Sequence, residues 1–312
     1  RQISELLAPP YVAARRAADA FAARDHAAAW LTQLAADQPI VDHTDRFFAD
    51  HVVGRLAGEL DSIAGAVRAA IGDGATIPAR RVHQLHRSLV WIFDCRIRSF
   101  ERKRYHSLSD EPNKAMNLNS YIGLMGGSYD VIDGPDGRSL VPATGPGADI
   151  DIDDTDYVLT LDADSVLLPE YCLRLVHLME QPGNERIAVC QTPYSAYPGS
   201  ATRIERLAGA TTDVQHLLHQ GMTHYDATFW VGANAVLRKR ALDEIMEAEH
   251  DGTRVVRRYI QDRTPIEDTE SSIDLVAKGW ELHNYNERLS YSATPPDFGA
   301  LAIQRQRWAN GG

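Results

Sequence analysis

Short apolar runs rich in β-branched and aromatic residues recur along this 312-residue chain from residue 88 onward. Patterns with helical spacing lie between several of these runs, over residues 169–180 and 201–220. Strands that alternate with helices are typical of a parallel α/β sheet. The sequence therefore predicts an α/β fold around a mostly parallel central sheet. The predicted strands are "SLVWIF" (88–93), "YVLTL" (157–161), "IAVCQ" (187–191) and "FWVGANAVL" (229–237).

The first 87 residues have a different texture. Residues 11–36 are Ala-rich, and a second helix, which Thr44 could cap, is predicted to end at Gly72. Its apolar positions recur at spacings of three and four, which makes one buried stripe. We interpret residues 1–87 as a helical insertion or cover, and residues 88–312 as the core domain. The stripe consists of Val52, Leu56, Leu60, Ile63, Val67 and Ile71.

Composition excludes several classes of protein. The 43 acidic residues outnumber the 32 Lys and Arg residues, and the resulting net charge of −11 argues against nucleic acid as a partner. Three cysteines without CxxC spacing indicate a reducing compartment rather than a disulfide framework. No run approaches the roughly 20 apolar residues of a membrane span. The chain begins at Arg1 in helix-like sequence, and we expect it to be a segment of a longer protein.

Two aspartates follow the predicted strand "YVLTL" at once. Asp162 and Asp164 are two residues apart, and in an extended chain such side chains point to the same side. Open α/β sheets bind ligands beyond the carboxyl ends of their strands. Two carboxylates there suit Mg²⁺ or Mn²⁺, which takes further ligands from substrate phosphates. The alternative is that both residues serve as turn and capping residues.

A second acidic pair, Glu267 and Asp268, is predicted at the start of a helix that ends before Gly279. One of these carboxylates could act as a general base. Acidic residues in a first turn are also favoured by the helix dipole alone, so capping explains the pair equally well.

The chain closes on "QRQRW", in which Gln304, Arg307 and Trp308 share one face if the segment is helical. An amide, a guanidinium and an indole on one face could bind an anion and stack on a sugar ring. They could also form an ordinary exposed helix edge.

Three further segments carry candidate ligand contacts. Lys114 in "EPNKAMNLN" could hold a nucleotide diphosphate, or could be a solvated lysine. Asp94, at the end of the predicted strand "LVWIFD", could accept hydrogen bonds from a base or ribose, or could be a turn residue. "GANAV" is Gly-rich enough for close ligand approach, which makes Gly232 and Asn234 candidates for substrate binding.

Taken in order, these motifs resemble those of the family 2 glycosyltransferases. The likeness is to the processive, membrane-embedded branch that includes bacterial cellulose synthase, other β-glycan synthases and the glucosyltransferase of periplasmic glucans. It covers roughly residues 85–312. The matching motifs are KAxxLN (114–119), LDAD (161–164), QTP (191–193), Gly-x-Asn (232–234), ED (267–268) and QxxRW (304–308).

The resemblance implies a GT-A fold, in which a Rossmann-like nucleotide-binding half, with residues 1–87 as its insertion, joins an acceptor half. It implies inverting transfer of a sugar from a nucleotide sugar, for which we expect a UDP-sugar, onto a growing β-linked polysaccharide with Mg²⁺ or Mn²⁺. An inverting transfer needs one base for the attacking hydroxyl, and a metal ion can carry the charge of the departing diphosphate. A retaining hydrolase would need a close pair of carboxylates, which is not evident here.

The resemblance also assigns roles by position. Asp268 would be the base, and Trp308 would stack under the acceptor sugar. The nucleotide and its diphosphate would be contacted by Asp94, Lys114, Asp162, Gln304 and Arg307, and the metal ion by Asp162 and Asp164.

Three departures from the family pattern stand out. Ile266 replaces the Thr that usually precedes Glu-Asp, residues 11–87 are longer and more helical than the usual link, and the opening strand with its Asn-Glu is absent. We expect that strand upstream of Arg1, and transmembrane segments outside this chain that hold the domain at the cytoplasmic face of the cell membrane. The alternatives are a non-processive transfer onto a lipid or small acceptor, and a nucleotide-sugar-binding domain without turnover.

Overall fold

The chain forms two compact units, Arg1–Arg98 and Ser99–Gly312, which are described separately below. No helix in the described part of the chain combines the length and the apolar character that crossing a bilayer requires. The computed structural model describes residues 10–192, 195–232, 234–252, 254–264 and 266–311.

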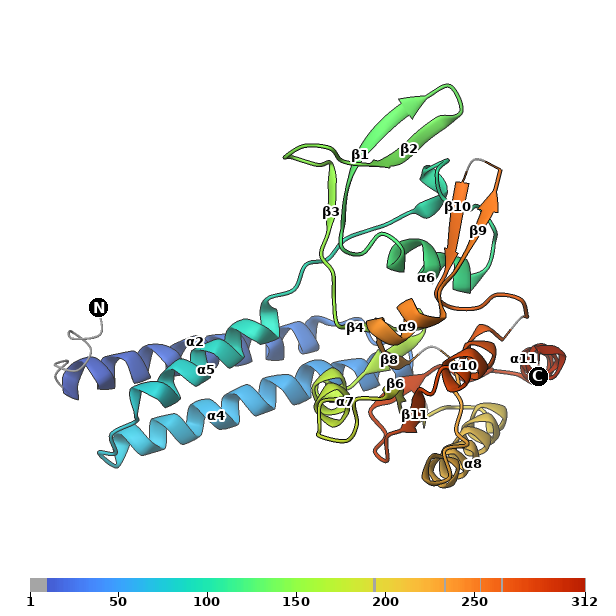
Figure 1. Ribbon diagram of the computed structural model, residues 1–312. Coiled ribbons are helices and arrows are strands. Elements are labelled where there is room, and N and C mark those ends of the chain that lie inside the picture. The colour runs from blue at the N-terminus through green and yellow to red at the C-terminus, as the bar shows by residue number, and fades with distance from the viewer. Residues whose placement is uncertain (1–9, 193–194, 233, 253, 265, 312) are drawn as a thin grey trace. The chain divides into compact units, whose positions relative to one another are not determined.

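The first unit is helical (Figure 1). Asp42 caps α3 through its carboxylate, which accepts hydrogen bonds from the backbone N–H groups of Thr44 and Asp45, so the cap lies two residues before the expected Thr44. The core between α2 and α4 is formed by Ala28, Leu31, Val53, Ala57 and Leu60. The helices are α2 (Pro10–Asp37), α3 (His43–Phe47), the π-helix η1 (Phe48–Gly54), α4 (Arg55–Gly72) and α5 (Ala79–Phe93).

The prediction of a strand over residues 88–93 is wrong, because these residues are the last turns of α5. Val82, Leu85 and Leu89 face the core of this unit at helical spacings of three and four. The run "LVWIF" continues that helix, and a short apolar run alone cannot distinguish a strand from a helix end. Asp94 therefore caps the end of a helix rather than ending a strand. The expected boundary at 87/88 also lies inside α5.

The second unit is built around a four-stranded sheet in the order β11-β6-β8-β4 (Figure 1). β11 and β6 are parallel, whereas β8 is antiparallel to both β6 and β4. The sheet is thus mixed, with β4, β6 and β11 running in one direction and β8 in the other, and the expectation of a mostly parallel sheet is not confirmed. A continuous buried run such as "AVLR" does not encode the direction of its strand. The strands are β4 (Tyr157–Thr160), β6 (Ile187–Gln191), β8 (Ala235–Arg238) and β11 (Glu281–Asn284).

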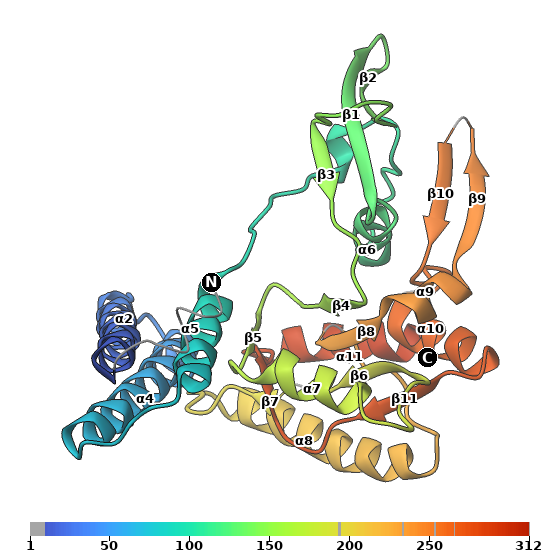
Figure 2. The same cartoon turned by 60° about the vertical axis from the view of Figure 1, so that its left-hand side comes forward.

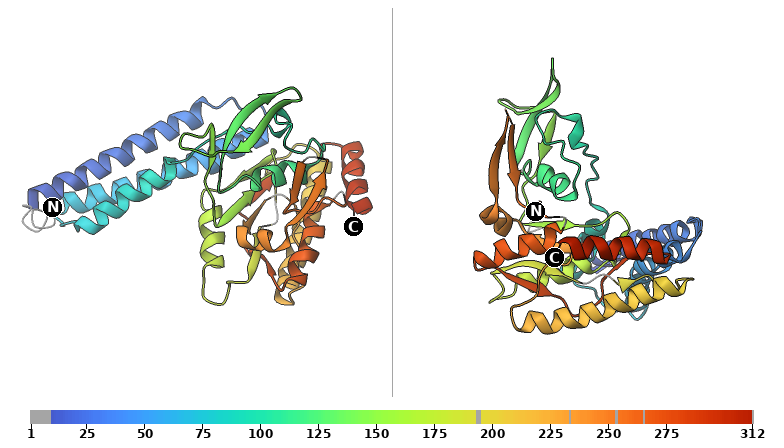
Figure 3. Two further views of the ribbon diagram at one scale, coloured as in Figure 1. Left: turned by 45° about the horizontal axis from the view of Figure 1, so that its top comes forward. Right: turned by 90° about the vertical axis from the view of Figure 1, so that its right-hand side faces the viewer.

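Helices cover this sheet on both sides. Figures 2 and 3 show α8 along one side, and α9 and α10 along the other. The main core includes Val189 and Leu237 of the sheet, Leu242 and Leu275 of these helices, and Trp280. The helices are α6 (Lys114–Ile122), α7 (Tyr171–Met179), α8 (Arg203–His224), α9 (Lys239–Ile245), α10 (Glu267–Ala277) and α11 (Phe298–Gly311), with the 3₁₀ turn η2 (Arg102–Arg104).

Residues 133–156, expected to be a loop, contain most of a small antiparallel sheet in the order β2-β1-β3. Pro135 and Asp136 form the two-residue hairpin turn between β1 and β2, Gly137 follows it at a φ of 115°, and Leu140 packs against Ile152. The Gly, Pro and Asp residues of this segment are typical of turns, so its composition predicted a loop instead of these short strands. The smaller sheets contain β1 (Gly127–Gly134), β2 (Gly137–Pro142) and β3 (Ile150–Ile152), then β5 (Ser165–Leu167), β7 (Ser195–Ala196) and β12 (Ser290–Ser292), and finally β9 (Glu247–Asp251) and β10 (Arg254–Arg258).

Candidate functional site

Several candidate residues meet at one edge of the four-stranded sheet. Since β8 is antiparallel to β4 and β6, its first residues lie at the same edge as the carboxyl ends of those two strands. The starts of α6 and α10 also reach this edge, because Lys114 of α6 contacts both Asp162 after β4 and Glu267 of α10. We call the residues at this edge the sheet-edge cluster; they are Lys114, Asp162, Asp164, Gly232, Glu267 and Asp268.

Lys114 links two carboxylates from different elements. Its Nζ lies 2.7 Å from Oδ1 of Asp162 and 3.4 Å from Oε1 of Glu267. Asn113 caps α6 by accepting a hydrogen bond from the N–H of Met116 at 2.6 Å, which fixes Lys114 as the first helical residue. Burial lowers the pKa of the Lys114 ammonium, but the hydrogen bonds and charges of the two carboxylates outweigh it, so the pKa lies above its usual value. Lys114 is therefore a fixed positive charge at this edge.

The charges of the two aspartates after β4 influence each other. Asp162 forms a turn in which its carbonyl accepts the N–H of Ser165 at 3.1 Å, and its side chain is 46% exposed. The Tyr197 hydroxyl donates to the backbone carbonyl of Asp164 at 3.0 Å. Burial and then the charge of Asp162 raise the pKa of Asp164, although a backbone hydrogen bond and Lys114 partly oppose this. A cation near both carboxylates would relieve that repulsion.

Asp268 is in a more buried environment at the start of α10. Its Oδ1 accepts the N–H of Thr269 at 2.7 Å. Burial, together with the charge of Glu267, raises the pKa of Asp268 from 3.8 to about 6, against the opposing effects of the Thr269 hydrogen bond and of Lys114. This carboxyl group can therefore exchange a proton near neutral pH.

Gly232 lies directly beside Asp268. Its φ is 102°, a left-handed conformation that favours glycine, and a Cβ at this position would lie 3.4 Å from Oδ2 of Asp268. Gln191 holds the preceding residues in place: its Nε2 donates to the carbonyl of Phe229 at 2.8 Å, and its Oε1 accepts the N–H of Val231 at 2.9 Å. The sequence identified Gln191 only as part of the QTP motif, and its role as a buried clamp became visible only in three dimensions.

Asn234 lies two residues further on and is buried. Its Nδ2 donates to Oγ of Ser292 at 3.3 Å, and its carbonyl accepts the hydroxyl of Tyr171 at 2.5 Å. Its Oδ1 is buried without a hydrogen-bond partner. A buried amide oxygen normally accepts a hydrogen bond, so the Asn234 Oδ1 is available as an acceptor for a ligand or a water molecule.

The residues of "QRQRW" lie on α11, as predicted. Arg305 of this helix donates to Oγ1 of Thr211 on α8 at 2.5 Å, and its guanidinium lies 4.4 Å from the Trp308 ring centre. Gln304 and Trp308 are partly buried, and Arg307 is exposed. No hydrogen bond or ion pair among the described residues joins Gln304, Arg307 or Trp308 to the sheet-edge cluster. Asp94 belongs to the first unit.

Within the described residues, no group of three or more His, Cys, Asp or Glu side chains is arranged to hold a metal ion. His216 and His219, three residues apart on α8, have the spacing of a helical metal-ligand pair. Both are buried, and His219 shares a hydrogen bond of 2.8 Å with Thr228. Asp162 and Asp164 offer two carboxylates. Mg²⁺ commonly takes one or two carboxylates and completes its coordination with water and substrate phosphates, so this pair fits such an ion.

Comparison with known proteins assigns the chain to a family. Residues 157–312, which contain β4, the Asp162–Asp164 pair and everything that follows, match glycosyl transferase family group 2. The chain belongs to this family. Lys114 and Asp94 lie outside the matched region.

Two curated relatives of this glycosyltransferase are cellulose synthase catalytic subunits described as UDP-forming. Cellulose synthase 1 of Komagataeibacter xylinus is 25% identical over 161 residues, which are 50% of this chain and 20% of the relative. The subunit of Komagataeibacter sucrofermentans is 25% identical over the same length, which is 19% of that protein. The alignment thus spans about a fifth of each relative.

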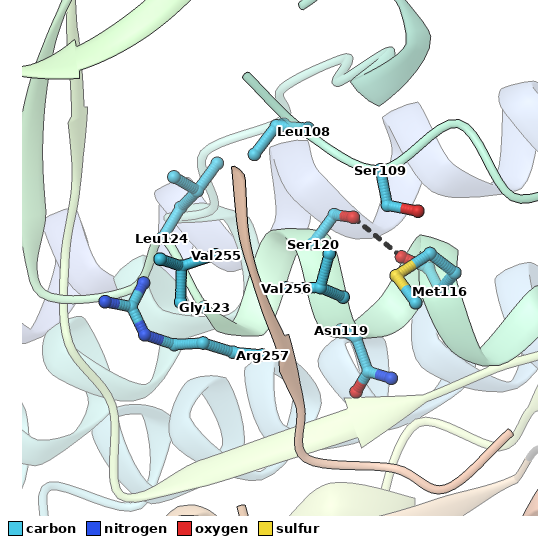
Figure 4. A pocket seen from close by; sticks show the side chains of 10 residues that line it. All are labelled: Leu108, Ser109, Met116, Asn119, Ser120, Gly123, Leu124, Val255, Val256 and Arg257. Carbon is cyan, nitrogen blue, oxygen red and sulfur yellow. Dashed lines mark hydrogen bonds between the residues drawn. The ribbon is translucent and has the colours of Figure 1, made fainter. Parts of the chain in front are cut away.

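One pocket of this glycosyltransferase lies elsewhere, between α6 and β10 (Figure 4). Met116, Leu124 and Val256 give it an apolar wall, and Arg257 lies at one side. The Ser120 hydroxyl is engaged, because it donates to the carbonyl of Met116 at 2.8 Å. None of the sheet-edge residues lines this pocket.

Proposed function

We propose that this chain transfers a sugar, with inversion, from a UDP-sugar to a growing β-linked glycan. The relatives support the donor, since both are described as UDP-forming. A mixed sheet flanked by helices, with the candidate residues at one edge, is compatible with the GT-A fold that the sequence resemblance implies. We also propose that the domain lies at the cytoplasmic face of the cell membrane, held there by transmembrane segments outside this chain.

The observation that carries the proposal is the position of Asp268, whose Oδ2 lies beside Gly232 at the sheet edge where Lys114 contacts Asp162 and Glu267. A base that removes a proton from an attacking hydroxyl works best with a pKa near the working pH, and burial brings the pKa of Asp268 to about 6. Gly232 leaves the space in front of Oδ2 free of a side chain. We therefore assign Asp268 as the base that accepts the proton of the acceptor hydroxyl.

The remaining residues hold the donor in this proposal. Lys114 attracts the diphosphate, Asp162 and Asp164 provide the carboxylates for Mg²⁺ or Mn²⁺, and Gly232 and Asn234 line the path of the sugar. The ion, when bound, supplies positive charge for the departing diphosphate. Asp94 would contact the nucleotide, Gln304 and Arg307 the diphosphate, and Trp308 the acceptor sugar.

UDP release from a panel of UDP-sugars with Mn²⁺, in the presence of an oligosaccharide acceptor, tests the proposal. We expect release with at least one donor, its loss in EDTA, and its loss in Asp268→Asn. Products longer than the acceptor by many units would support polysaccharide extension, and addition of a single unit would favour the non-processive alternative. UDP binding without release in the intact protein would contradict the assignment as a transferase.

A further inference from the structure

Lys114 has two carboxylate partners, and they differ in environment. Asp162 is the closer partner at 2.7 Å and has a side chain that is 46% exposed. Glu267 lies 3.4 Å away, and its side chain is only 17% exposed. The ammonium thus lies between a half-exposed carboxylate after β4 and a more enclosed one on the first turn of α10.

This arrangement creates a conflict for ligand binding. Under the proposed function, Asp162 must face a divalent ion, yet its Oδ1 is already in contact with the Lys114 ammonium. Two cations on one carboxylate repel each other strongly at such distances. We therefore expect the contact between Lys114 and Asp162 to weaken when an ion binds this carboxylate.

We propose that Glu267 is a positioning residue that retains Lys114 in the site when the divalent ion takes Asp162. This inference rests on the proposed function. The ammonium keeps its contact with Glu267, turns away from Asp162 and faces the diphosphate. Glu267 itself touches neither donor nor acceptor, so its influence on ligand binding passes through Lys114.

The sign of the effect separates this role from a simple electrostatic one. A carboxylate close to a diphosphate repels it, so removing an independent carboxylate should strengthen nucleotide binding. If Glu267 holds the cation that attracts the diphosphate, its removal should weaken binding instead. The same substitution should lose this effect once Lys114 is replaced.

A double-mutant cycle on the 312-residue chain measures this coupling. Calorimetry follows two probes, Mn²⁺ alone and UDP with Mn²⁺, for wild type, Glu267→Gln, Lys114→Met and the double variant. Asp274→Asn is the matched control, because it removes one carboxylate from the same helix, where Asp274 pairs with Arg263 at 2.6 Å. Glu267→Asp keeps the charge, and thermal melting of each variant confirms its fold.

We expect Glu267→Gln to weaken UDP–Mn²⁺ binding by about three- to tenfold, on the order of one charge-assisted contact. In the Lys114→Met background the same change should leave binding unchanged or tighten it. Lys114→Met should tighten binding of Mn²⁺ alone about threefold or more, because the competing cation is gone. Glu267→Asp should recover part of the loss, and Asp274→Asn should match wild type.

The two probes distinguish the failure of this inference from that of the proposed function. If UDP–Mn²⁺ binds but Glu267→Gln has equal effects in both backgrounds, or tightens binding in wild type, the positioning role is wrong and the function stands. If UDP does not bind, yet Glu267→Gln weakens Mn²⁺ binding only when Lys114 is present, the positioning role stands and the proposed function falls. No Mn²⁺ binding in any variant would overturn both.

Discussion

The carboxyl end of β4 and the first turn of α10 both present acidic residues to the same sheet edge, but in different surroundings. After β4, Asp162 is half exposed and pairs with Lys114 at 2.7 Å. On α10, Asp268 is more enclosed, and no ion pair is described for it. Its pKa rises to about 6, mainly through burial. Two carboxylates of the same type thus acquire different chemistry from their environments.

This difference suggests a division of labour. A solvated carboxylate that already binds one cation can exchange it for another, whereas an enclosed carboxylate with a raised pKa is suited to accept a proton. Glu267, the first residue of α10, links the two regions, since it contacts Lys114 and its charge adds to the raised pKa of Asp268. The predictions below test whether the two regions have separate roles.

The largest effect is expected from Asp268→Asn, which keeps the shape of the side chain but removes the proton acceptor. Turnover in the intact enzyme should fall by a factor on the order of 10² or more, with donor affinity nearly unchanged. Glu267→Gln should reduce turnover less. Steady-state kinetics and donor binding by calorimetry measure the two quantities. Near-normal turnover in Asp268→Asn, with loss in Glu267→Gln, would mean that the other carboxylate is the base.

The second prediction concerns the stability of the fold, because keeping the buried Asp268 carboxylate ionised above its raised pKa lowers the free energy of unfolding. Asp268 binds its proton more tightly in the folded state, so its contribution to stability is fully present below pH 3.8 and is lost as the pH rises through about 6. The shift of about two units corresponds to at most about 3 kcal/mol. Asp268→Asn should therefore stabilise the fold by about 1–3 kcal/mol at pH 8.

Urea unfolding at several pH values measures this difference. The gain of Asp268→Asn over wild type should shrink toward zero as the pH falls from about 6 to below 4. Asp274→Asn serves as the control, since this carboxylate is paired with Arg263 on the surface of the same helix. An equal gain at pH 4 and pH 8 would show that packing, rather than the charge of Asp268, is responsible.

The third prediction addresses the end of β4. Asp164→Ala should lower the affinity for UDP in the presence of Mn²⁺ by about tenfold or more, because it removes one of two carboxylates available to the ion. Binding in EDTA should be the same in wild type and variant. If the variant instead kept its affinity and changed only the pH dependence of turnover, the β4 end would share the role of Asp268.

Two strands of the central sheet and the limits of α10 could be predicted from the sequence. The strands at 157–161 and 187–191 are confirmed as β4 and β6, and α10 begins at Glu267 and ends before Gly279, whose φ is 76°. The direction of β8 could not be predicted, because a buried strand has the same residues whichever way it runs. The helical state of residues 88–93 depends on how α5 packs, which a short apolar run does not encode.

The candidate residues could be singled out from the sequence one at a time, but their contacts with one another could not be predicted. Sequence singled out Lys114 and Asp162 separately, and their contact arises only because α6 and β4 converge on the same edge. Likewise, Gly232 was recognised as a position of close approach without its neighbour Asp268. Contacts between distant segments depend on tertiary packing, and local patterns carry no information about it.

The smallest effect is expected from Arg307→Lys, which tests whether α11 works with the β4 end. Arg307 is exposed, and the described contacts of α11 run through Arg305 to Thr211 on α8. If Arg307 grips the diphosphate, an ammonium cannot reproduce the bidentate contact of a guanidinium, and donor affinity should fall about three- to tenfold.

Arg305→Lys provides the matched control for this substitution, because it changes the same chemistry on the same helix. It should alter thermal stability, since it weakens the contact with Thr211 and the packing on Trp308, and leave donor affinity near wild type. Calorimetry with UDP and Mn²⁺ measures both variants. Equal donor affinity in wild type and Arg307→Lys would exclude a diphosphate contact by Arg307 and leave donor binding to the β4 end and Lys114.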